Sequence, residues 1–411
     1  MPRVALILPT GTYRAEDFVA AAGAVGAEVV VVSDGAQAMA EAMGDRALEA
    51  DLCDPEAAAA AIVDLARRLP LDAVVGVDDQ GVEAAARAAA RLGLRHGEPA
   101  AVAITRDKAA MRRALAGAGV PQPDFEVVEA GEDPEAAVAR LGPPVVVKPS
   151  GLSASRGVIR VDSVSGAAAV AERVRAIAAA AGQVGAALVV ERFLDGPEVA
   201  VEGLLDRGSL RTLAVFDKPD PLDGPYFEET IYVTPSRHPP GLVEAAVGVV
   251  AAAAAAIGLA EGPVHAEVRL TAAGPRMVEV AARSIGGHCS RILRFGAGTS
   301  LEELILAHAL GRPIDGAAGS SASRATGVMM LPIPASGTLR AVGGVEEARA
   351  VPGMDGLEIS IPLGRPVVAL PEGDRYLGFL FASGQDPAFV EEALRRAHQA
   401  LAVVIEAAPG R

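Results

Sequence analysis

The chain has 411 residues and a formal net charge of −15; 51% of its residues are hydrophobic, and it has 9 Phe, 4 Tyr and no Trp. Its length allows several domains and a large core. The negative charge and the scarcity of aromatic residues argue against a nucleic-acid partner, because phosphate backbones need basic patches and bases stack on aromatic rings. Two cysteines, Cys53 and Cys289, give neither a disulfide framework nor a zinc motif, so we expect a cytoplasmic protein.

Lysine is rare in this chain. Of the 37 basic residues only three are lysines, namely Lys108, Lys148 and Lys218. Where arginine carries almost every surface charge, a lysine marks a position that needs a compact ammonium group, because the two side chains are not interchangeable there. Chance is the alternative for any one of the three.

Residues 1–98 alternate short apolar runs with alanine-rich stretches. The pattern predicts strands at Val4–Pro9, Glu28–Ser33 and Ala73–Asp78, and helices at Ala15–Val25, Pro55–Leu69 and Gly81–Leu92. This alternation is typical of an α/β fold with a doubly wound parallel sheet. The turn after the first strand lacks the glycine fingerprint of dinucleotide-binding proteins.

The rest of the chain mixes helices and strands. Residues 99–190 predict a helix at Arg106–Gly117, a strand at Phe125–Val128 and a helix at Ala167–Ala181. Residues 245–260 are uncharged and mostly alanine. Spanning a bilayer takes about 20 strongly apolar residues, so we expect a buried helix and no membrane partner. Residues 315–327 are typical of a linker, and the final region predicts short strands followed by a helix at Pro387–Glu406.

Two alternating runs within residues 265–283 flank a Gly-Pro turn and predict a hairpin. A turn centred on Ala273 places Glu267 opposite Glu279, Val268 opposite Val278 and Leu270 opposite Arg276. One face then holds Val268, Leu270, Val278 and Val280, and the other holds His265, Glu267, Arg269 and Glu279. Opposed carboxylates repel each other, and a bridging Mg²⁺ ion would remove that repulsion. The alternative is a solvated face on which Arg269 offsets the charge.

Residues 145–158 deliver Lys148 from an apolar strand into a loop with three serines and two glycines. Backbone N–H groups and hydroxyls in such loops bind phosphate oxygens, and lysine adds a point charge. A mobile surface hairpin is the alternative.

Residues 189–205 contain Glu191 and Glu198 on either side of a short turn. The turn could pair with an adenine edge while Glu198 accepts from ribose hydroxyls, or it could be a plain connection.

In this order, the two lysines, the Ser/Gly loop, E-x-x-x-x-G-x-E and two glutamates followed by Arg283 resemble the ATP-grasp superfamily over residues 1–320. The chain looks most like the amino-acid ligases of that superfamily, whose C-terminal domain the last 90 or so residues also resemble. The resemblance implies an N-terminal doubly wound domain at 1–98 and ATP-grasp subdomains at 99–190 and 191–318. It also implies a small α+β C-terminal domain at 319–411.

The resemblance carries binding roles to individual residues. It implies that Lys108 and Lys148 contact the ATP phosphates, and that the loop with Ser153, Ser155 and Gly157 closes over them. It implies that Glu191, Phe193 and Leu194 surround the adenine and that Glu198 binds the ribose. Glu267 and Glu279 match the Mg²⁺ ligands, for which Mn²⁺ is a substitute. Many superfamily members have an additional Asn ligand where this chain has Ala281.

The resemblance also implies a catalytic group, in which Arg283 steadies the transferred phosphoryl. We place His265 in this group. Lys218 joins it as the third rare lysine, with a surface ion pair to Asp217, Asp220 or Asp223 as the alternative. Gly286, Gly287 and His288 follow Arg283 and are expected to line the substrate pocket, where some relatives have a bulky aromatic residue at the position of Gly287. A glycine there is expected to leave volume for larger side chains.

The function implied by the resemblance is ATP-dependent joining of a carboxylate to an amine, both from small molecules such as amino acids, through an acyl phosphate and with release of ADP. A carboxylase-like or purine-precursor ligase is the alternative enzyme, and a non-catalytic nucleotide-binding module is the alternative outside enzymes. A homodimer is the expected assembly only because dimers are the commonest oligomers.

Overall fold

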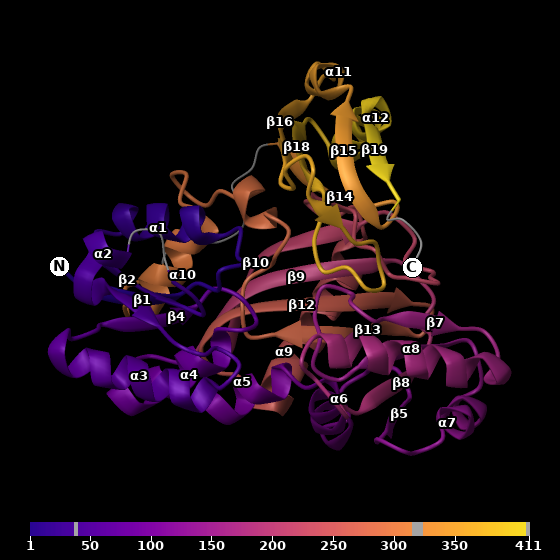
Figure 1. Cartoon of the computed structure of the whole chain (residues 1–411), viewed down its shortest axis with the longest axis horizontal. Helices are drawn as coiled ribbons and strands as arrows, with labels where there is room; N and C mark the ends of the chain where they lie inside the picture. Colours follow the sequence, from indigo (N-terminus) through magenta and orange to yellow (C-terminus); the bar gives the residue numbers. More distant parts are fainter. Residues whose placement is uncertain (37–39, 315–323, 408–411) are drawn as a thin grey trace.

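The computed structural model describes residues 1–36, 40–314 and 324–407 (Figure 1). The N-terminal sheet is parallel and has the order β3-β2-β1-β4. Its strands are β1 (Arg3–Ile7), β2 (Glu28–Ser33), β3 (Ala47–Glu49) and β4 (Ala73–Gly76), and its helices are α1 (Ala15–Ala24), α2 (Ala40–Met43), α3 (Pro55–Arg68) and α4 (Val82–Leu92). The expected doubly wound sheet is therefore confirmed. The sequence pattern missed β3, which is only three residues long.

A second, antiparallel sheet has the order β5-β8-β6-β7. Its strands are β5 (Phe125–Val128), β6 (Val145–Pro149), β7 (Ile159–Val161) and β8 (Leu188–Arg192). Helices α7 (Pro134–Leu141) and α8 (Ala167–Ala180) pack against this sheet. The helix expected to begin at Arg106 begins two residues later, because Asp107 is its N-cap. It is α6 (Lys108–Gly117), and α5 (Pro99–Thr105) precedes it.

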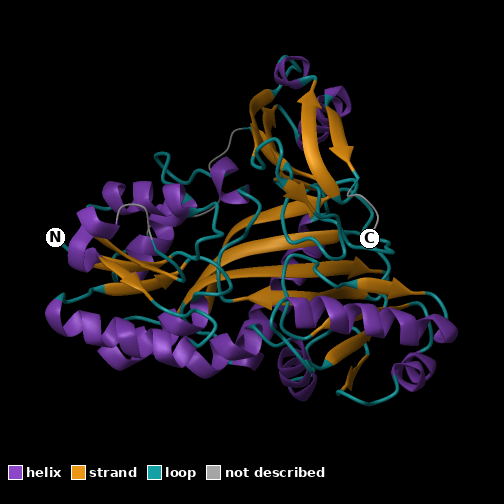
Figure 2. Cartoon of the chain, viewed as in Figure 1, coloured by secondary structure: helices purple, strands orange, loops and turns teal. Residues whose placement is uncertain are grey.

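The largest sheet has eight strands and crosses the middle of the molecule (Figure 2). Its order is β13 (Gly274–Ala281), β12 (Gly262–Thr271), β9 (Glu198–Asp206), β10 (Ser209–Lys218), β11 (Ile231–Thr234), β14 (Ala325–Leu331), β18 (Gly378–Gly384) and β16 (Met354–Ile359). The sheet thus continues from the expected ATP-grasp region into the expected C-terminal domain. The boundary placed at 318/319 and most of the expected linker at 315–327 lie outside the described residues.

The C-terminal part completes a smaller sheet. It contains β15 (Gly337–Gly343), β17 (Pro366–Val367) and β19 (Ala402–Glu406). Helices α11 (Val345–Arg349) and α12 (Pro387–Ala400) pack against each other and against strands of the large sheet. The expectation of a helix through Glu406 is wrong for its last residues. The β-branched run Val403–Ile405 pairs with β15 instead, as β-branched residues favour strands.

The apolar helix is α9 (Pro240–Ile257), and its expected burial holds for one face only. Ala246, Val250, Ala253, Ala254 and Ile257 pack into the core that β9, β12 and β13 share. By length and composition α9 could also cross a membrane, and 28% of it is buried inside the protein. The remaining helix is α10 (Leu301–Ala309), and three-residue and four-residue 3-10 turns lie at Gly44–Arg46, Val164–Gly166 and Cys289–Ile292.

A close approach between α11 and the end of α12 gives a test of this packing. Gly344 has a φ of 74°, and a Cβ atom there would lie 1.8 Å from the carbonyl oxygen of Ala400. We expect Gly344→Ala to lower the midpoint of thermal unfolding, because it adds left-handed strain of about 1–2 kcal/mol to this overlap. Gly343→Ala is the control, since its Cβ would lie 3.7 Å from the nearest atom. Equal midpoints for the two variants would contradict the packing.

Candidate active site

Strand register aligns charged side chains across β9, β10 and β12. Glu198 pairs with Lys218 on one side and with Arg269 on the other. Two residues further along β9, Ala200 pairs with Glu267, which in turn pairs with Glu279 of β13. Because side chains two residues apart lie on the same face of a strand, these rows share one face of the sheet.

The hairpin confirms the expected pairing of Glu267 with Glu279 but not the rest of the register. A bulge between Glu267 and Val268 shifts the pairing, so that Val268 lies opposite Met277 and Arg269 opposite Arg276. Met277 is fully buried and takes the core position expected for Val278. The extra residue in β13 rotates the turn while the two glutamates stay opposed, which is how a bulge redirects side chains near a functional site.

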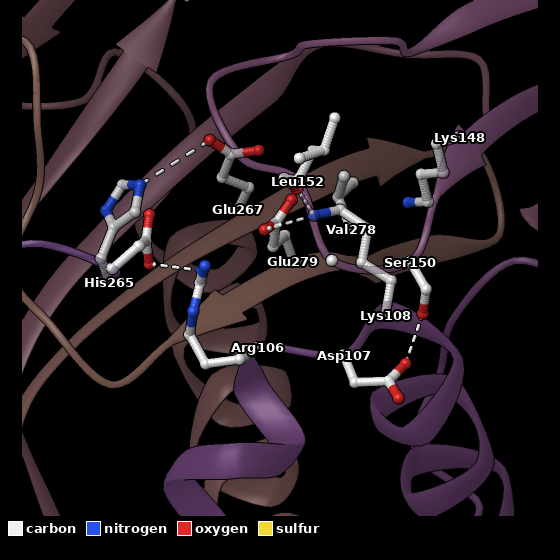
Figure 3. A network of polar contacts seen from close by, with 12 residues as sticks. Arg106, Asp107, Lys108, Lys148, Ser150, Leu152, His265, Glu267, Val278 and Glu279 are labelled. Carbon is white, nitrogen blue, oxygen red and sulfur yellow. Dashed lines mark hydrogen bonds and ion pairs between the residues drawn. The ribbon is translucent and has the colours of Figure 1, made fainter. Parts of the chain in front are cut away.

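Lysines hold the two opposed glutamates. Lys108 Nζ lies 3.0 Å from Glu279 Oε1, and Lys218 Nζ lies 2.9 Å from Glu267 Oε1. Burial would raise the pKa of Glu267, but the Lys218 ammonium lowers it to about 2, so the carboxylate is charged. Figure 3 shows Lys108 and Glu279 directed toward each other, with His265 directed toward Glu267. Two charged carboxylates on one face are a donor set that fits Mg²⁺.

Lys218 is the last residue of β10. Its side chain is only 3% exposed, and Nζ contacts Glu198 at 2.6 Å and Glu229 at 2.7 Å in addition to Glu267. Burial opposes its charge, but these three carboxylates raise the pKa of Lys218 well above its ordinary value. The surface ion pair is therefore wrong, and two of the acids considered for it bind arginines: Asp217 binds Arg237 and Asp220 binds Arg395.

Lys148 and Glu191 belong to a second buried charge group. Glu191 accepts two hydrogen bonds from Arg112, at 2.7 and 3.1 Å, and lies 2.8 Å from Lys148 Nζ. Burial would raise the pKa of Glu191, yet Arg112 and Lys148 lower it to about 2. Burial also lowers the pKa of Lys148, against the attraction of Glu191. Sequence reasoning missed Arg112, since nothing in its helix distinguishes it from other arginines.

The Ser/Gly loop reaches the C-terminal domain. Gly157 donates its N–H to the Pro371 carbonyl at 2.9 Å, and Arg156 donates to the Glu372 carbonyl at 3.1 Å. Ala154 and Ser155 have φ angles of 56° and 54°. Non-glycine residues rarely adopt this left-handed conformation, and it recurs in ligand-binding loops. The loop with Ser153, Ser155 and Gly157 is therefore a strained segment. It follows the strand that carries Lys148 and bonds to the C-terminal domain.

The expected adenine and ribose contacts are partly engaged within the protein. Phe193 donates its N–H to the Pro144 carbonyl at 3.0 Å, so its carbonyl and the Leu194 backbone remain for a base edge. Glu198 is 6% exposed and binds both Lys218 and Arg269, the latter at 2.8 Å. A ribose hydroxyl would have to share the Glu198 carboxylate with these two cations.

Arg283 lies against the N-terminal domain. Its guanidinium is 3.0 Å from Asp79, which also binds Arg106 at 2.9 Å. Burial would raise the pKa of Asp79, but Arg283 and Arg106 hold it well below its usual range. Sequence reasoning missed Asp79, although a signal existed. It follows β4, next to β1 at the point where strand order reverses, and ligands of parallel α/β sheets bind outside such points.

His265 rests on a glutamate that sequence reasoning also missed. Glu202 of β9 is fully buried; its Oε2 lies 3.3 Å from His265 Nδ1 and accepts the Ile285 N–H at 3.0 Å. Burial lowers the pKa of His265, but Glu202 and Glu267 together raise it to about 9. An imidazolium at neutral pH thus links Glu267 to the segment after Arg283.

The volume expected beside Gly287 is filled. A Cβ atom at Gly287 would lie 2.8 Å from Met330 Sδ, and its φ of 62° strains any other residue. Its N–H donates to the Tyr13 hydroxyl at 2.6 Å, and a Cβ at Gly286 would lie 3.1 Å from that hydroxyl. His288 is buried between Tyr13 and Phe379. The expectation of open space at Gly287 is therefore wrong, because β14 supplies Met330 there.

The chain matches three domain families. Residues 19–96 match the ATP-grasp N-terminal domain, residues 141–292 the ATP-grasp domain, and residues 329–406 the L-amino acid ligase C-terminal domain 2. The L-amino acid ligase of Bacillus licheniformis is 25% identical and superposes with a TM-score of 0.80 over 99% of both chains. The N5-carboxyaminoimidazole ribonucleotide synthetase of Thermotoga maritima, 20% identical with a TM-score of 0.72 over 99% of this chain and 100% of that one, shares the fold.

Curated relatives match over part of their length. Alanine–anticapsin ligase of Bacillus subtilis is 28% identical over 265 residues, which are 60% of this chain and 55% of that protein. An uncharacterized protein of Sinorhizobium fredii is 26% identical over 74% of this chain and 62% of its own length. Phosphoribosylamine–glycine ligase of Streptomyces coelicolor is 36% identical, over 38% of this chain and 35% of that protein. The chain thus spans about three-fifths or less of these curated relatives.

The buried Glu191 group predicts a measurable loss of stability. The pKa of Glu191, lowered from 4.5 to about 2, corresponds to about 3 kcal/mol of stability that is complete above pH 4.5 and is lost as the pH falls through 2. We expect Glu191→Gln to lower the free energy of unfolding by about this amount at pH 7, because it leaves Arg112 and Lys148 without their anion. Urea unfolding at several pH values measures the difference, which should narrow below pH 4.5.

The matched control is Glu126→Gln on the neighbouring strand β5, where Glu126 binds the exposed Arg140. A surface pair of this kind contributes about 0–1 kcal/mol. An equal loss in the two variants, or a Glu191→Gln loss that does not depend on pH, would contradict the assignment.

Proposed function

Because the chain is an ATP-grasp protein with an L-amino acid ligase C-terminal domain, we propose that it joins the carboxylate of one amino acid to an amine at the expense of ATP. The observation that carries the proposal is the opposed pair Glu267 and Glu279, with lysine ammonium groups at 2.9 and 3.0 Å. Opposed carboxylates next to cationic groups suit a site where a metal ion and phosphates meet. The compartment we propose is the cytoplasm.

In the proposed reaction, the two glutamates hold Mg²⁺, or Mn²⁺ with the same oxygens, and the ion neutralises phosphate charge. Lys108 and Lys148 orient the phosphates, and Glu191, Phe193, Leu194 and Glu198 hold the nucleoside. Lys218 is presented by three carboxylates at the face that would meet the transferred phosphoryl or the donor carboxylate. Catalysis would come mainly from positioning and from neutralising charge.

Arg283 and the segment after it would hold the donor. Asp79 fixes the Arg283 guanidinium at 3.0 Å, which supports a role in steadying the acyl phosphate and the oxyanion formed when the amine attacks. His265 lies beside Glu267, with Nε2 3.7 Å from Oε1, and would orient this metal ligand. Gly286, Gly287 and His288 would border the donor side chain together with Met330, so we propose a donor pocket of limited size.

Two other functions are weaker. A carboxylase-like or purine-precursor ligase has the same fold, but residues 329–406 of this chain match the L-amino acid ligase C-terminal domain 2. A nucleotide-binding module without catalysis would not need Lys108, Lys148, Glu267, Glu279 and Arg283 together. The amino-acid ligase is therefore the function we propose.

Phosphate release over a panel of paired amino acids tests the reaction. We expect release that requires ATP, a divalent cation and at least one amino acid, with ADP as the nucleotide product. Hydroxylamine should trap a hydroxamate of the donor, because it attacks an acyl phosphate in place of the amine. Formation of AMP and pyrophosphate would contradict the proposed intermediate, and the absence of turnover across the panel would favour a binding module.

Glu279→Gln tests the metal assignment. It removes one of two anionic ligands at a site that carries the transition-state charge, so we expect phosphate release to fall by about 10²-fold or more. Glu244→Gln on the exposed side of α9 is the control and should keep the wild-type rate. A Glu279→Gln variant that unfolds like the wild type and turns over at the wild-type rate would show that Glu279 holds no metal.

A further inference from the structure

Three potential metal ligands meet outside the proposed active site, where the N-terminal domain contacts the central sheet. Asp206 ends β9, Glu261 directly precedes β12 and His308 lies on α10. One ligand atom from each lies within 4.8 Å of those of the other two. Both Glu261 and His308 line a cavity of about 80 Å³ that also touches β4 and α4. Five residues of β12 separate this group from Glu267.

His308 has the chemistry of a ligand without its ion. His308 is 3% exposed, and among the described residues its Nε2 has no hydrogen-bond partner, although Glu261 Oε2 is 3.4 Å away. Nε2 is therefore available as a ligand atom. An imidazole nitrogen that faces a carboxylate is stabilised when a cation lies between the two groups.

Arg95 currently neutralises the two acids. Its Nε binds Glu261 Oε2 at 2.7 Å, and its other nitrogen binds Asp206. The side chain of Arg95 is 26% exposed and that of Asp206 is 39% exposed. A cation can therefore reach the group from solvent by taking the place of the Arg95 head group.

We propose that Asp206, Glu261 and His308 form a second divalent-cation site, of the class that Zn²⁺ prefers, in competition with Arg95. Zn²⁺ binds both imidazole nitrogen and carboxylate oxygen, and a site with three protein ligands completes its tetrahedral shell with water. The imidazole disfavours Mg²⁺, which takes oxygen ligands. The ion would tie the end of β9 and the start of β12 to α10.

Zinc binding to the full chain tests this site. The metal-free protein is mixed with Mg²⁺ and ADP and titrated with Zn²⁺ against a chromophoric chelator. We expect His308→Gln and Asp206→Asn to lose one tight zinc site that the wild type has. Asp206→Asn alters a partly exposed side chain, so it tests the site even where His308→Gln folds poorly. The matched control His96→Gln lines the same cavity outside the ligand group and should keep the site.

Competition with Arg95 gives a second readout. We expect Arg95→Gln to tighten the zinc site by about tenfold, because the cation no longer displaces an ion pair. Zn²⁺ should also raise the unfolding midpoint of the wild type and not that of Asp206→Asn, since an ion that binds only the folded state stabilises it. Equal zinc stoichiometry in wild type, His308→Gln and Asp206→Asn, or weaker binding by Arg95→Gln, would overturn the proposal. None of these measurements depends on turnover.

Discussion

The site depends on one constraint, which is that carboxylates buried on a sheet face must each meet a cation. A buried charge without a partner costs several kcal/mol, and an arrangement of partners must therefore be fixed before ligands arrive. Strand register fixes it here. Because Lys218 and Arg269 flank Glu198 directly across β10 and β12, the cations lie beside the acid without any loop having to place them. The bulge in β13 keeps Glu279 opposite Glu267 although the pairing nearer the turn is shifted by one residue.

The parts of the site that could be predicted are those encoded by local alternation. The facing of Glu267 and Glu279 follows from the two-residue period of a hairpin. The rarity of lysine singled out Lys218, which the structure buries among three carboxylates. The bulge could not be predicted, because no residue type in β13 marks it. The one unpaired residue nevertheless moves Val278 from one face of the sheet to the other. The fold class followed from the βα alternation in the first 98 residues, while β19 was hidden behind the helical pattern of α12.

The residues that escaped prediction share a different cause. Glu229, Arg112 and Glu202 are unremarkable in their own segments, and their roles depend on partners that are distant in the sequence. Arg112 and Glu191 are 79 residues apart, and Arg14, which donates to the Ser284 hydroxyl, is 270 residues from it. Such pairs arise only when the domains pack together. The same holds for Gly287, whose expected free volume is removed by Met330 from a strand that the local sequence does not place nearby.

Three parts of the chain thus enclose the segment after Arg283. The N-terminal domain contributes Asp79 and the Tyr13 hydroxyl, the central sheet contributes Glu202, and β14 contributes Met330. A segment held from three sides has few alternative conformations, which suits a region that must present a substrate in one geometry. Small side chains at 286 and 287 let these three sides approach closely, and this explains why glycine stands there although the space is filled.

Ala281 lies beside the charged groups around Glu267. It pairs with His265 in the row that contains Glu202, so its methyl group lies next to an imidazolium. On the other side of Glu267, ligand oxygens of Glu198 and Glu229 lie within 4.8 Å of it and share the Lys218 ammonium. Three carboxylates this close would repel one another strongly in a buried setting, and Lys218 is the cation that makes their approach favourable. The carboxylates of Glu198, Glu229 and Glu267 therefore concentrate negative charge around the Lys218 ammonium, and a cation is bound most favourably there.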